Sequence, residues 1–480
     1  MNPILLNPER KLNPERKLKE ECGVFAIWNH EEAARLAYLG LYAIQHRGQE
    51  SAGIVSLHEG AHINHKGLGL VGEVFTEPHL RRLLGKTAIG HVRYSTTGDN
   101  LLTNAQPLTA NLLNGPLALA HNGNLVNAKE LRLELQKSGA IFQGTTDTEV
   151  VLHLLSRFDS SDIIECLEHA ARRIVGAFSF VCLSKDNLVA MRDPQGFRPL
   201  VLGRKKNDQG IEVPVIASET CAFDLIGAQY VREIEPGEIF WVDAEGEHSR
   251  RWDYESSVKQ PVQPARCIFE HVYFSRPDSV VFGHSVYATR KSFGQWLAKE
   301  SPVDADIVVP VPDSGVPAAL GYSVQSGIPF ELGIIRNHYV GRTFIQPAQS
   351  IRSFGVKIKL NPQSAILKGK RVIVIDDSLV RGTTSKKIIG LIRAAGAKEV
   401  HMRIAAPPTI GPCYYGVDTP QKADLIAANS SVQEICKFIE ADSLAYLSIK
   451  GLFAALHSDV EGPNKTFCAA CFDGKYPTPV

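Results

Sequence analysis

The strongest constraint on the fold is an apolar run that ends in two acids, VIVIDDSLVRGTTS at residues 372–385. The β-branched residues predict a buried strand, and the hydroxyl-rich stretch after Asp376 and Asp377 predicts a loop that opens a helix. Backbone N–H groups at such a helix N-terminus can bind a phosphate. Paired acids at the carboxyl end of a strand suit ribose hydroxyls or a magnesium ion. An ordinary strand end with an N-cap acid is the alternative, and the full string disfavours it.

The sequence around this motif alternates between strand and helix patterns. ADIVVPVP (residues 305–312) precedes a helical stretch and then FELGIIR (330–336), while KRVIVIDD (370–377) precedes a second helical stretch and EVHMRIAA (399–406). Continuous β-branched runs that alternate with helices are typical of a parallel sheet covered on both faces. The second half of the chain is therefore predicted to be an α/β domain.

The first 250 residues follow a different pattern, in which many short strand-like runs lie close together with a few helices between them. Such spacing favours antiparallel pairing and an α+β domain. The polar, proline-containing stretch SSVKQPVQP at residues 256–264 is the candidate linker. Two domains are also what a chain of 480 residues would be expected to form.

Composition excludes several classes of function. The formal net charge is only +1, and no basic run is present, so a nucleic-acid-binding surface is not expected. No apolar stretch approaches the roughly 20 residues that cross a bilayer, and the N-terminus lacks the apolar core of a signal peptide. We therefore expect a cytoplasmic protein that binds neither nucleic acid nor membrane.

The string at residues 372–385 resembles the signature of type I phosphoribosyltransferases, which bind 5-phosphoribosyl 1-diphosphate. VPVPDSGVPAA (309–319) resembles the loop that receives the pyrophosphate in that family, and RNHYVGRTFIQP (336–347) resembles the loop that closes over the substrate. The resemblance implies magnesium ligands at Ser314, Asp376 and Asp377. The residues that it implies for 5-phosphoribosyl 1-diphosphate are Asp313, Ser314, Gly315, Asp376, Asp377, Ser378, Arg381, Gly382, Thr383 and Thr384.

A ribosyl acceptor must be a nucleophile, and the simplest is ammonia, which glutamine releases on hydrolysis. Cys22, directly before the apolar run GVFAIW, is the candidate catalytic nucleophile for that step. Residues 1–21 form a polar leader in which the hexapeptide NPERKL occurs twice. If this leader is removed, the free α-amine of Cys22, with a pKa of about 8, can act as general base beside its own thiol.

Three further motifs supply the other parts of a glutamine-hydrolysing site. The guanidinium group of Arg93 in HVRYSTTG can donate two parallel hydrogen bonds to a carboxylate. Asn122 and Gly123 in LAHNGN are a plausible oxyanion pair, and Asp147 in GTTDTEV can bind an ammonium group. Each motif alone has a structural alternative, a surface salt bridge for the arginine and a turn for the Asn-Gly pair. Their occurrence together, in one order, disfavours those alternatives.

Together with QHRGQESAG, which holds Arg47 and Gly48, these motifs resemble the class II glutamine amidotransferase domain. The resemblance implies an N-terminal nucleophile fold with αββα layers. Precursors in that family end in an acid before the nucleophile, so the bond between Glu21 and Cys22 is the expected cleavage point of a propeptide.

Four of the nine cysteines have a pattern that suggests metal binding. Cys468 and Cys471 form a C-x-x-C pair, and Cys267 and Cys413 complete a set of four. On chemistry alone, structural zinc and a 4Fe-4S cluster both remain open. The contexts RCIFE, GPCYYG and FCAACFDG resemble those of the iron-sulfur branch of one amidotransferase family, which implies one 4Fe-4S cluster per subunit.

A class II glutaminase joined to a type I phosphoribosyltransferase resembles the amidophosphoribosyltransferase family. The resemblance implies formation of 5-phosphoribosylamine, glutamate and pyrophosphate from 5-phosphoribosyl 1-diphosphate, glutamine and water, the committed step of purine synthesis. It also implies purine nucleotide inhibitors and a homotetramer. The expected divisions are residues 1–21 for the propeptide, 22–255 for the glutaminase, and 256–480 for the phosphoribosyltransferase domain with a cluster-binding C-terminal tail.

Two other functions were weighed against this one. A sugar-phosphate or aspartate amidotransferase would share the glutaminase, but the ribosyl-binding string disfavours it. A nucleotide-sensing repressor would need a basic DNA-binding surface, and the near-neutral charge of the chain disfavours that as well.

Overall fold

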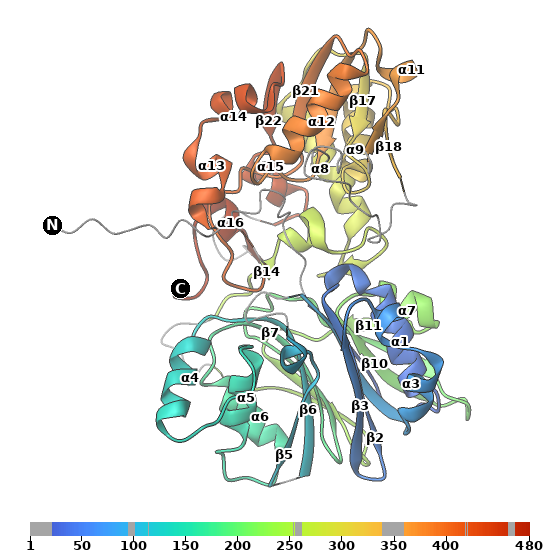
Figure 1. Ribbon diagram of the computed structural model, residues 1–480, viewed down its shortest axis with the longest axis vertical. Helices are drawn as coiled ribbons and strands as arrows, with labels where there is room; N and C mark the ends of the chain where they lie inside the picture. Colours follow the sequence, from blue (N-terminus) through green and yellow to red (C-terminus); the bar gives the residue numbers. More distant parts are fainter. Residues whose placement is uncertain are drawn as a thin grey trace, which may run out of the picture.

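The structure is a computed structural model that describes residues 22–94, 101–113, 115–252, 254, 262–337, 360–417, 419, 421–458 and 466–480. The leader, most of the candidate linker and residues 338–347 of the expected substrate-closing loop lie outside these ranges. Figure 1 shows two halves, with the N-terminal half below and the C-terminal half above. None of the helices in the described ranges combines the length and apolar character that crossing a membrane requires.

The N-terminal half contains two antiparallel sheets that face each other (Figure 1). In spatial order, the first sheet consists of β11 (Gln229–Glu233), β9 (Val201–Lys206), β10 (Glu212–Ala217), β1 (Gly23–Ile27), β4 (Thr87–Arg93), β2 (Ser51–His58) and β3 (Ala61–Leu68). The second consists of β13 (Glu247–Arg251), β12 (Glu238–Val242), β8 (Leu188–Arg192), β7 (Gly176–Leu183), β6 (Gly115–Leu125) and β5 (Leu108–Leu112).

Helices cover the outer face of each sheet, which completes four layers. The first sheet is covered by α1 (Ala33–Ala43), α2 (Val71–Val74), α3 (Glu77–Arg82) and α7 (Cys221–Ile226), and the second by α4 (Ala128–Lys137), α5 (Thr148–Leu155) and α6 (Ile163–Ala171). Side chains of β1 alternate between the two sides, because Val24 and Ala26 pack between the sheets whereas Phe25 and Ile27 pack under α1. The predicted α+β fold with αββα layers is confirmed.

The C-terminal half is built on a parallel sheet of four strands. Its spatial order is β17 (Ile307–Pro310), β20 (Arg371–Asp376), β21 (Glu399–Ile404) and β22 (Ser443–Tyr446). One face packs on α8 (Val286–Glu300) and α9 (Val316–Ser326), and the other on α12 (Thr383–Ala394) and α14 (Val432–Ile439). Val308 and Ile373 point to the first face while Val309 and Val374 point to the second, so both faces are buried as predicted.

One strand prediction is only partly correct. In FELGIIR, Phe330 forms a single parallel bridge with Val308 at the sheet edge, and the chain then leaves the sheet. It continues as β18 (Ile334–Arg336), which pairs antiparallel with β19 (Leu360–Pro362). The run contains a glutamate and an exposed leucine before its glycine, so it lacks the continuous apolar surface of a central parallel strand.

Short elements connect the two halves. β14 (Arg266–Cys267) pairs in parallel with β23 (Phe467–Cys468), which brings the C-terminal tail back to the start of the second half.

The remaining elements of the described ranges are short. They are a π-helix at Glu270–Phe274, β15 (Val280–Val281), β16 (His284–Ser285), α11 (Ser364–Leu367), α13 (Ile426–Asn429), α15 (Ile449–Ala454), α16 (Ala470–Asp473) and 3-10 turns at Gln45–Arg47, Leu102–Asn104 and Lys422–Asp424.

Candidate active sites and a cysteine-lined cavity

Cys22 lies at one end of the first sheet, directly before β1. The strand β1 begins at the next residue, Gly23. The thiol is buried and its Sγ lies 3.5 Å from the carbonyl oxygen of Tyr94. Because Gly23 pairs with Val92, Cys22 lies beside Arg93, the last residue of β4. Arg93 is itself buried, so the structure places it in the interior and not at a surface salt bridge.

The predicted oxyanion pair lies on the facing strand β6. The hydroxyl oxygen of Ser218 accepts a hydrogen bond from the backbone N–H of Val24 at 2.9 Å, and the side-chain amide of Asn122 lies 3.4 Å from it. Ser218 therefore connects the nucleophile strand to the oxyanion strand. Sequence reasoning missed this residue because an isolated serine after a strand carries no distinguishing pattern.

Asn122 has an atom available for a ligand. Its side chain is fully buried, and its Oδ1 has no hydrogen-bond partner among the described residues. A half-turn of the side-chain amide of Asn122 would exchange the positions of Oδ1 and Nδ2, so that Oδ1 would accept a hydrogen bond from the hydroxyl group of Ser218. The oxygen of that hydroxyl group already accepts from the backbone N–H of Val24. That half-turn would leave the Nδ2 group as an unpaired donor, which is the group that a developing oxyanion needs.

Gly123 is fixed by its surroundings. A Cβ atom at this position would lie 2.1 Å from the carbonyl oxygen of Ala177, and φ is +151°. No residue with a side chain fits there, so the glycine allows β6 to approach β7 closely at the end nearest Cys22.

Asp147 caps α5 and is tied to the same strand. One carboxylate oxygen accepts from the backbone N–H of Thr148 and the other from that of Leu125, both at 2.9 Å. The Nδ1 atom of His121 lies 3.8 Å from the carboxylate. Burial lowers the pKa of His121, although the nearby carboxylate of Asp147 opposes this.

The second predicted site lies at the carboxyl ends of two adjacent parallel strands. Asp376 and Asp377 are buried at the end of β20, and Ser314 and Gly315 follow β17. Since Pro310 pairs with Ile375, the two loops lie at the same edge of the sheet. The structure therefore brings together the residues predicted to hold magnesium and 5-phosphoribosyl 1-diphosphate.

The loop after the two acids forms the N-terminus of α12, as predicted. Gly382 is the N-cap residue and α12 starts at Thr383. The hydroxyl group of Ser378 donates to the carboxylate of Asp377. Arg381, predicted to contact the ligand, lies 3.6 Å from the carboxylate of Asp424. On the neighbouring loop, Asp313 forms an ion pair with Arg336.

A buried arginine near this site was missed from the sequence. Arg290 of α8 donates to the carbonyl oxygens of His271 and Ser275, each at 2.8 Å. Burial lowers the pKa of Arg290, and the carboxylate of Asp377 is foremost among the charges that oppose this. Nothing in the local sequence YATRKSF distinguishes this residue from a surface arginine of an amphipathic helix.

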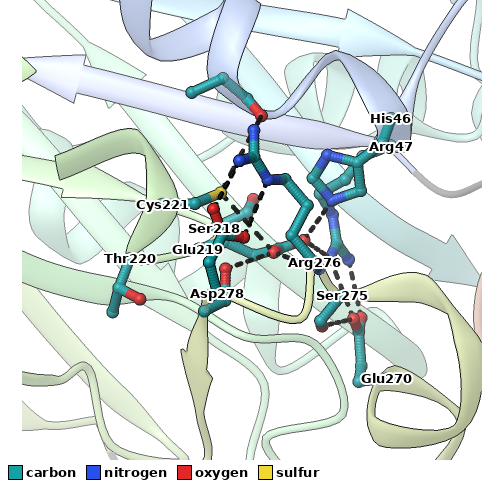
Figure 2. A network of polar contacts seen from close by, with 12 residues as sticks. His46, Arg47, Ser218, Glu219, Thr220, Cys221, Glu270, Ser275, Arg276 and Asp278 are labelled. Carbon is teal, nitrogen blue, oxygen red and sulfur yellow. Dashed lines mark hydrogen bonds and ion pairs between the residues drawn. The ribbon is translucent and has the colours of Figure 1, made fainter. Parts of the chain in front are cut away.

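A buried ionic network links the two halves (Figure 2). Arg47 donates from Nε to the carbonyl oxygen of Cys22 at 3.1 Å. Its other nitrogens contact Glu219 at 2.6 Å and Glu270 at 2.7 and 2.9 Å. The hydroxyl group of Ser275 also donates to Glu270, at 2.6 Å. The residue that carries the nucleophile is thus two hydrogen bonds away from a carboxylate of the C-terminal half.

The charges of this network are strongly coupled. Burial raises the pKa of Glu219, but His46 and Arg47 outweigh it and hold that pKa at about 2. Arg198 adds a second guanidinium group to Glu270, at 3.3 Å. Since Arg47, Glu219 and Glu270 have no solvent-exposed side-chain surface, the ions depend on one another and not on water.

The four cysteines predicted to bind a cluster line one cavity between the C-terminal tail and the loop around residue 413. Cys267 and Cys468 are opposite residues of the β14–β23 pair, and Cys471 lies in α16. Cys413 completes the set, and the aromatic side chains of Phe197, Phe269, Tyr415 and Tyr476 line the remaining walls. Burial raises the pKa of Cys468 to about 12.

The geometry of this cavity bears on the kind of group that it could hold. In the described ranges, no three His, Cys, Asp or Glu side chains are placed to hold one metal ion. Four thiols nevertheless surround a common cavity. Soft sulfur ligands spaced around a cavity suit a polynuclear group better than a single ion. Three other cysteines, Cys166, Cys182 and Cys221, are buried thiols, whereas Cys436 is only half-buried.

Comparison with known families agrees with the division into two halves. A model described as a glutamine amidotransferase domain matches residues 91–224, and one described as a phosphoribosyl transferase domain matches residues 290–410. The first range contains Arg93, Asn122, Gly123 and Asp147, and the second contains both loops of the ribosyl site.

Full-length relatives are also similar to the chain. Amidophosphoribosyltransferase 1, chloroplastic, of Arabidopsis thaliana is 54% identical over 460 residues, which is 96% of this chain and 79% of that protein. The amidophosphoribosyltransferase of Bacillus subtilis is 47% identical over 462 residues, with 96% and 95% covered. That of Methanocaldococcus jannaschii is 48% identical over 473 residues, with 96% and 98% covered.

Two solved structures share the whole fold. Glutamine phosphoribosylpyrophosphate amidotransferase from B. subtilis, complexed with ADP and GMP, superposes with a TM-score of 0.88 at 47% identity and covers 95% of this chain and 98% of that one. A structure described as the allosteric regulatory enzyme of purine biosynthesis gives a TM-score of 0.89 at 47% identity, with 95% and 96% covered.

Proposed function

The chain belongs to the amidophosphoribosyltransferase family, and from that premise we propose that it converts 5-phosphoribosyl 1-diphosphate, glutamine and water into 5-phosphoribosylamine, glutamate and pyrophosphate. The observation that carries the proposal is the presence, on one chain, of a buried cysteine before a strand that Ser218 links to Asn122, and of two acids before the N-terminus of α12. Arg93, Asn122, Gly123 and Asp147 lie inside the range matched by the glutamine amidotransferase family, which begins after Cys22, and both ribosyl loops lie inside the range matched by the phosphoribosyl transferase family. This reaction is the committed step of purine synthesis.

The N-terminal half would release ammonia from glutamine. In this step the thiolate of Cys22 attacks the side-chain amide carbon, and the carbonyl oxygen becomes an oxyanion held by the N–H of Gly123 and the amide of Asn122. Collapse of this intermediate expels ammonia and leaves a thioester, which water hydrolyses to glutamate and the free thiol. Arg93 would bind the α-carboxylate of the substrate and Asp147 its ammonium group.

We propose that Cys22 acts only after residues 1–21 are removed. While Cys22 is joined to Glu21, its nitrogen is an amide and cannot accept a proton. Cleavage would convert it into an amine that titrates near neutral pH, close enough to its own thiol to serve as general base. Intact mass of the purified, glutamine-active protein tests this, because retention of the leader would contradict it.

The C-terminal half would transfer the ribosyl group. Asp376 and Asp377 would hold the ribose hydroxyls, and the loop of Ser378, Arg381, Gly382, Thr383 and Thr384 would hold the 5-phosphate. Ammonia then attacks C1 of the ribose, and the bond from C1 to the pyrophosphate oxygen breaks. Asp313, Ser314 and Gly315 would receive the departing pyrophosphate. A magnesium ion held by Ser314, Asp376 and Asp377 would neutralise charge on the pyrophosphate.

We propose that Cys267, Cys413, Cys468 and Cys471 hold one 4Fe-4S cluster. Their common cavity and their soft sulfur donors support this. When bound, the cluster would join β14, the loop around residue 413 and the C-terminal tail as a structural crosslink. Iron and sulfide analysis of protein purified without oxygen should give four of each per chain. A stoichiometric zinc content would contradict the proposal.

Further features rest on the same relationship. We propose divisions at residues 1–21, 22–255 and 256–480, in keeping with the last strand of the N-terminal sheets, which ends at Arg251. Purine nucleotide inhibition is supported by the B. subtilis structure, which holds ADP and GMP. We also propose a homotetramer in the cytoplasm. Light scattering and cell fractionation test these two points, and the relatives described as chloroplastic give the alternative location.

The two sites can be separated by one substitution. Cys22→Ala should abolish synthesis of 5-phosphoribosylamine with glutamine, by at least about 10³-fold, because the nucleophile is lost. Synthesis with added ammonia should persist because the ribosyl site is unchanged. Loss of both activities in a folded variant would contradict the division of the reaction between the two halves.

A further inference from the structure

The loop that carries Cys413 contacts the oxyanion strand directly. A Cβ atom on Gly416 would lie 3.1 Å from the carbonyl carbon of Gly123 and 3.3 Å from its Cα and its oxygen. The two backbones therefore lie close together, and a side chain on Gly416 would require Gly123 to shift by a few tenths of an ångström. This contact joins a loop of the C-terminal half to the glycine expected to donate to the oxyanion.

We propose that the cysteine loop, defined as residues 413–416, positions the backbone of Gly123 for glutamine hydrolysis, with Gly416 as the contact point. The inference rests on the proposed function, because it takes Gly123 to supply the oxyanion N–H. It assigns to the C-terminal half a part in the geometry of the glutaminase site. Gly416 is a positioning residue, since it acts through Gly123.

Gly123 is confined on two sides. On one side, a Cβ atom on Gly123 would lie 2.1 Å from the carbonyl oxygen of Ala177, and on the other side the backbone contacts Gly416. Gly416 lies against the Cα and the carbonyl group of Gly123, so it restrains the Gly123 residue without touching its N–H group. With Ala177 on the other side, the residue has little freedom to shift, and the direction of its N–H is thereby restrained before a substrate arrives. Such preorganisation is what makes an oxyanion donor effective.

The cysteine loop is itself fastened to the N-terminal half. The amide Nδ2 of Asn124 donates to the carbonyl oxygen of Tyr414 at 2.9 Å. The guanidinium group of Arg198 donates to the carbonyl oxygen of Tyr415 at 2.7 and 2.9 Å. The ring of Tyr415 also stacks on Phe197, with 4.1 Å between the ring centroids. These bonds hold the loop against β6, so the contact at Gly416 is not incidental.

The sequence alone gives no sign of this arrangement. Gly416 and Gly123 are almost three hundred residues apart, and a glycine after two tyrosines reads as an ordinary turn. The value of φ at Gly416, +107°, explains why a glycine is needed there. It does not explain the contact, which follows from how the loop lies on β6.

Gly416→Ala tests the proposal, and Gly474→Ala is its matched control. Gly474 lies in the C-terminal tail three residues after Cys471 and has a φ of +71°, but nothing lies within 4 Å of a Cβ there. Both variants place alanine at a positive φ that favours glycine, so both carry backbone strain. Only the first presses a methyl group onto Gly123. Iron content and thermal unfolding should be measured for both.

We expect Gly416→Ala to lower kcat for glutamine-dependent synthesis by about tenfold, part of the 10²–10³-fold that loss of a whole oxyanion donor costs. KM for glutamine should stay within about twofold, because Arg93 and Asp147 are unaffected. Ammonia-dependent synthesis and the alkylation rate of Cys22 by iodoacetamide should match the wild type, since neither needs an oxyanion donor. Gly474→Ala should keep wild-type kcat.

Three results would overturn the inference. These are equal kcat in the two glycine variants, a parallel fall of ammonia-dependent synthesis in Gly416→Ala, or a rise in KM with kcat unchanged. If Gly416→Ala does not fold, Asn124→Asp is tested in its place. This substitution removes the hydrogen bond from Asn124 to Tyr414 without adding bulk. A kcat for Asn124→Asp equal to that of the wild type would then overturn the inference. Wild-type protein without glutamine-dependent synthesis would instead refute the proposed function itself.

Discussion

The two candidate sites are built by opposite means. Around Cys22, the site is made from buried side chains of strands that face each other across two sheets, with Ser218 and Asp147 tying the strands together. The ribosyl site is made from loops at one edge of a single sheet, where Ser314 and Ser378 remain partly exposed. A small neutral amide can be enclosed by rigid strands, whereas a large polyanion needs open backbone donors that later close over it.

The difference also predicts how each site fails. In the glutaminase half, the geometry depends on contacts with the other half, through Glu270 and the cysteine loop. The ribosyl loops depend on their own strand and helix. Perturbations at the boundary should therefore affect glutamine use first and ammonia use last.

The largest effect is expected at the boundary itself. Glu270→Ala removes the carboxylate shared by the buried guanidinium groups of Arg47 and Arg198 and leaves the Arg47–Glu219 pair in place, which should cost about 3–5 kcal/mol of unfolding free energy. Urea unfolding with fluorescence detection measures this. Glu270→Gln keeps the shape and should cost less. Equal stability of wild type and Glu270→Ala would show that the halves are independent.

Unlike Cys22→Ala, a substitution in the ribosyl half should lower synthesis with both nitrogen sources and affect glutamine hydrolysis much less. Asp377→Asn removes a charge proposed to hold magnesium and ribose, and should lower synthesis by about 10²–10³-fold with either nitrogen source. Glutaminase activity, measured as glutamate release, should fall much less. Asp424→Asn, at the edge of the same region, serves as the control for surface charge. A loss confined to glutamine-dependent synthesis would contradict the assignment.

Acid should weaken the glutaminase half through a buried histidine. Burial lowers the pKa of His91 from its usual 6.5 to about 3 in the folded protein. The unfolded chain therefore binds a proton first, and stability present above pH 6.5 is lost as the pH falls from 6.5 toward 3. At pH 5 the loss should be about 2 kcal/mol. Unfolding free energies between pH 7 and pH 5 should show a shallower slope for His91→Gln, and an unchanged slope would contradict the prediction.

The smallest effect is expected far from both sites. Ser431 caps α14, accepts from the backbone N–H of Glu434 at 3.3 Å and forms a capping box with its side chain. Ser431→Ala should lower the unfolding free energy by about 1 kcal/mol. Both activities at 25 °C should be unchanged. A fall in either one would mean that α14 contributes to a site.

Local patterns were sufficient to predict the ribosyl site, since a strand, two acids and a helix start lie within fourteen residues of sequence. The strand and helix periods also predicted the sheets of both halves. The run FELGIIR was misjudged in part, because an edge position depends on neighbours that the run does not contain. Pairing between distant strands cannot be inferred from a local period.

The supporting residues of the glutaminase site could not be predicted for the same reason. Ser218, Glu270 and Gly416 are ordinary in their local sequence, and each acquires its role from a partner more than ninety residues away. The candidate nucleophile and the candidate oxyanion pair could be proposed from the sequence because their motifs are short and distinctive. What surrounds them is a property of the folded chain.

The ionic network around Arg47 limits how such a protein can change over evolution or by engineering. Its members come from both halves, and each is buried against the others. A chimera that joins this N-terminal half to a C-terminal half without an acid at position 270 would lose the carboxylate that two buried guanidinium groups share. The halves are thus not interchangeable parts, and the residues at their boundary must be exchanged together.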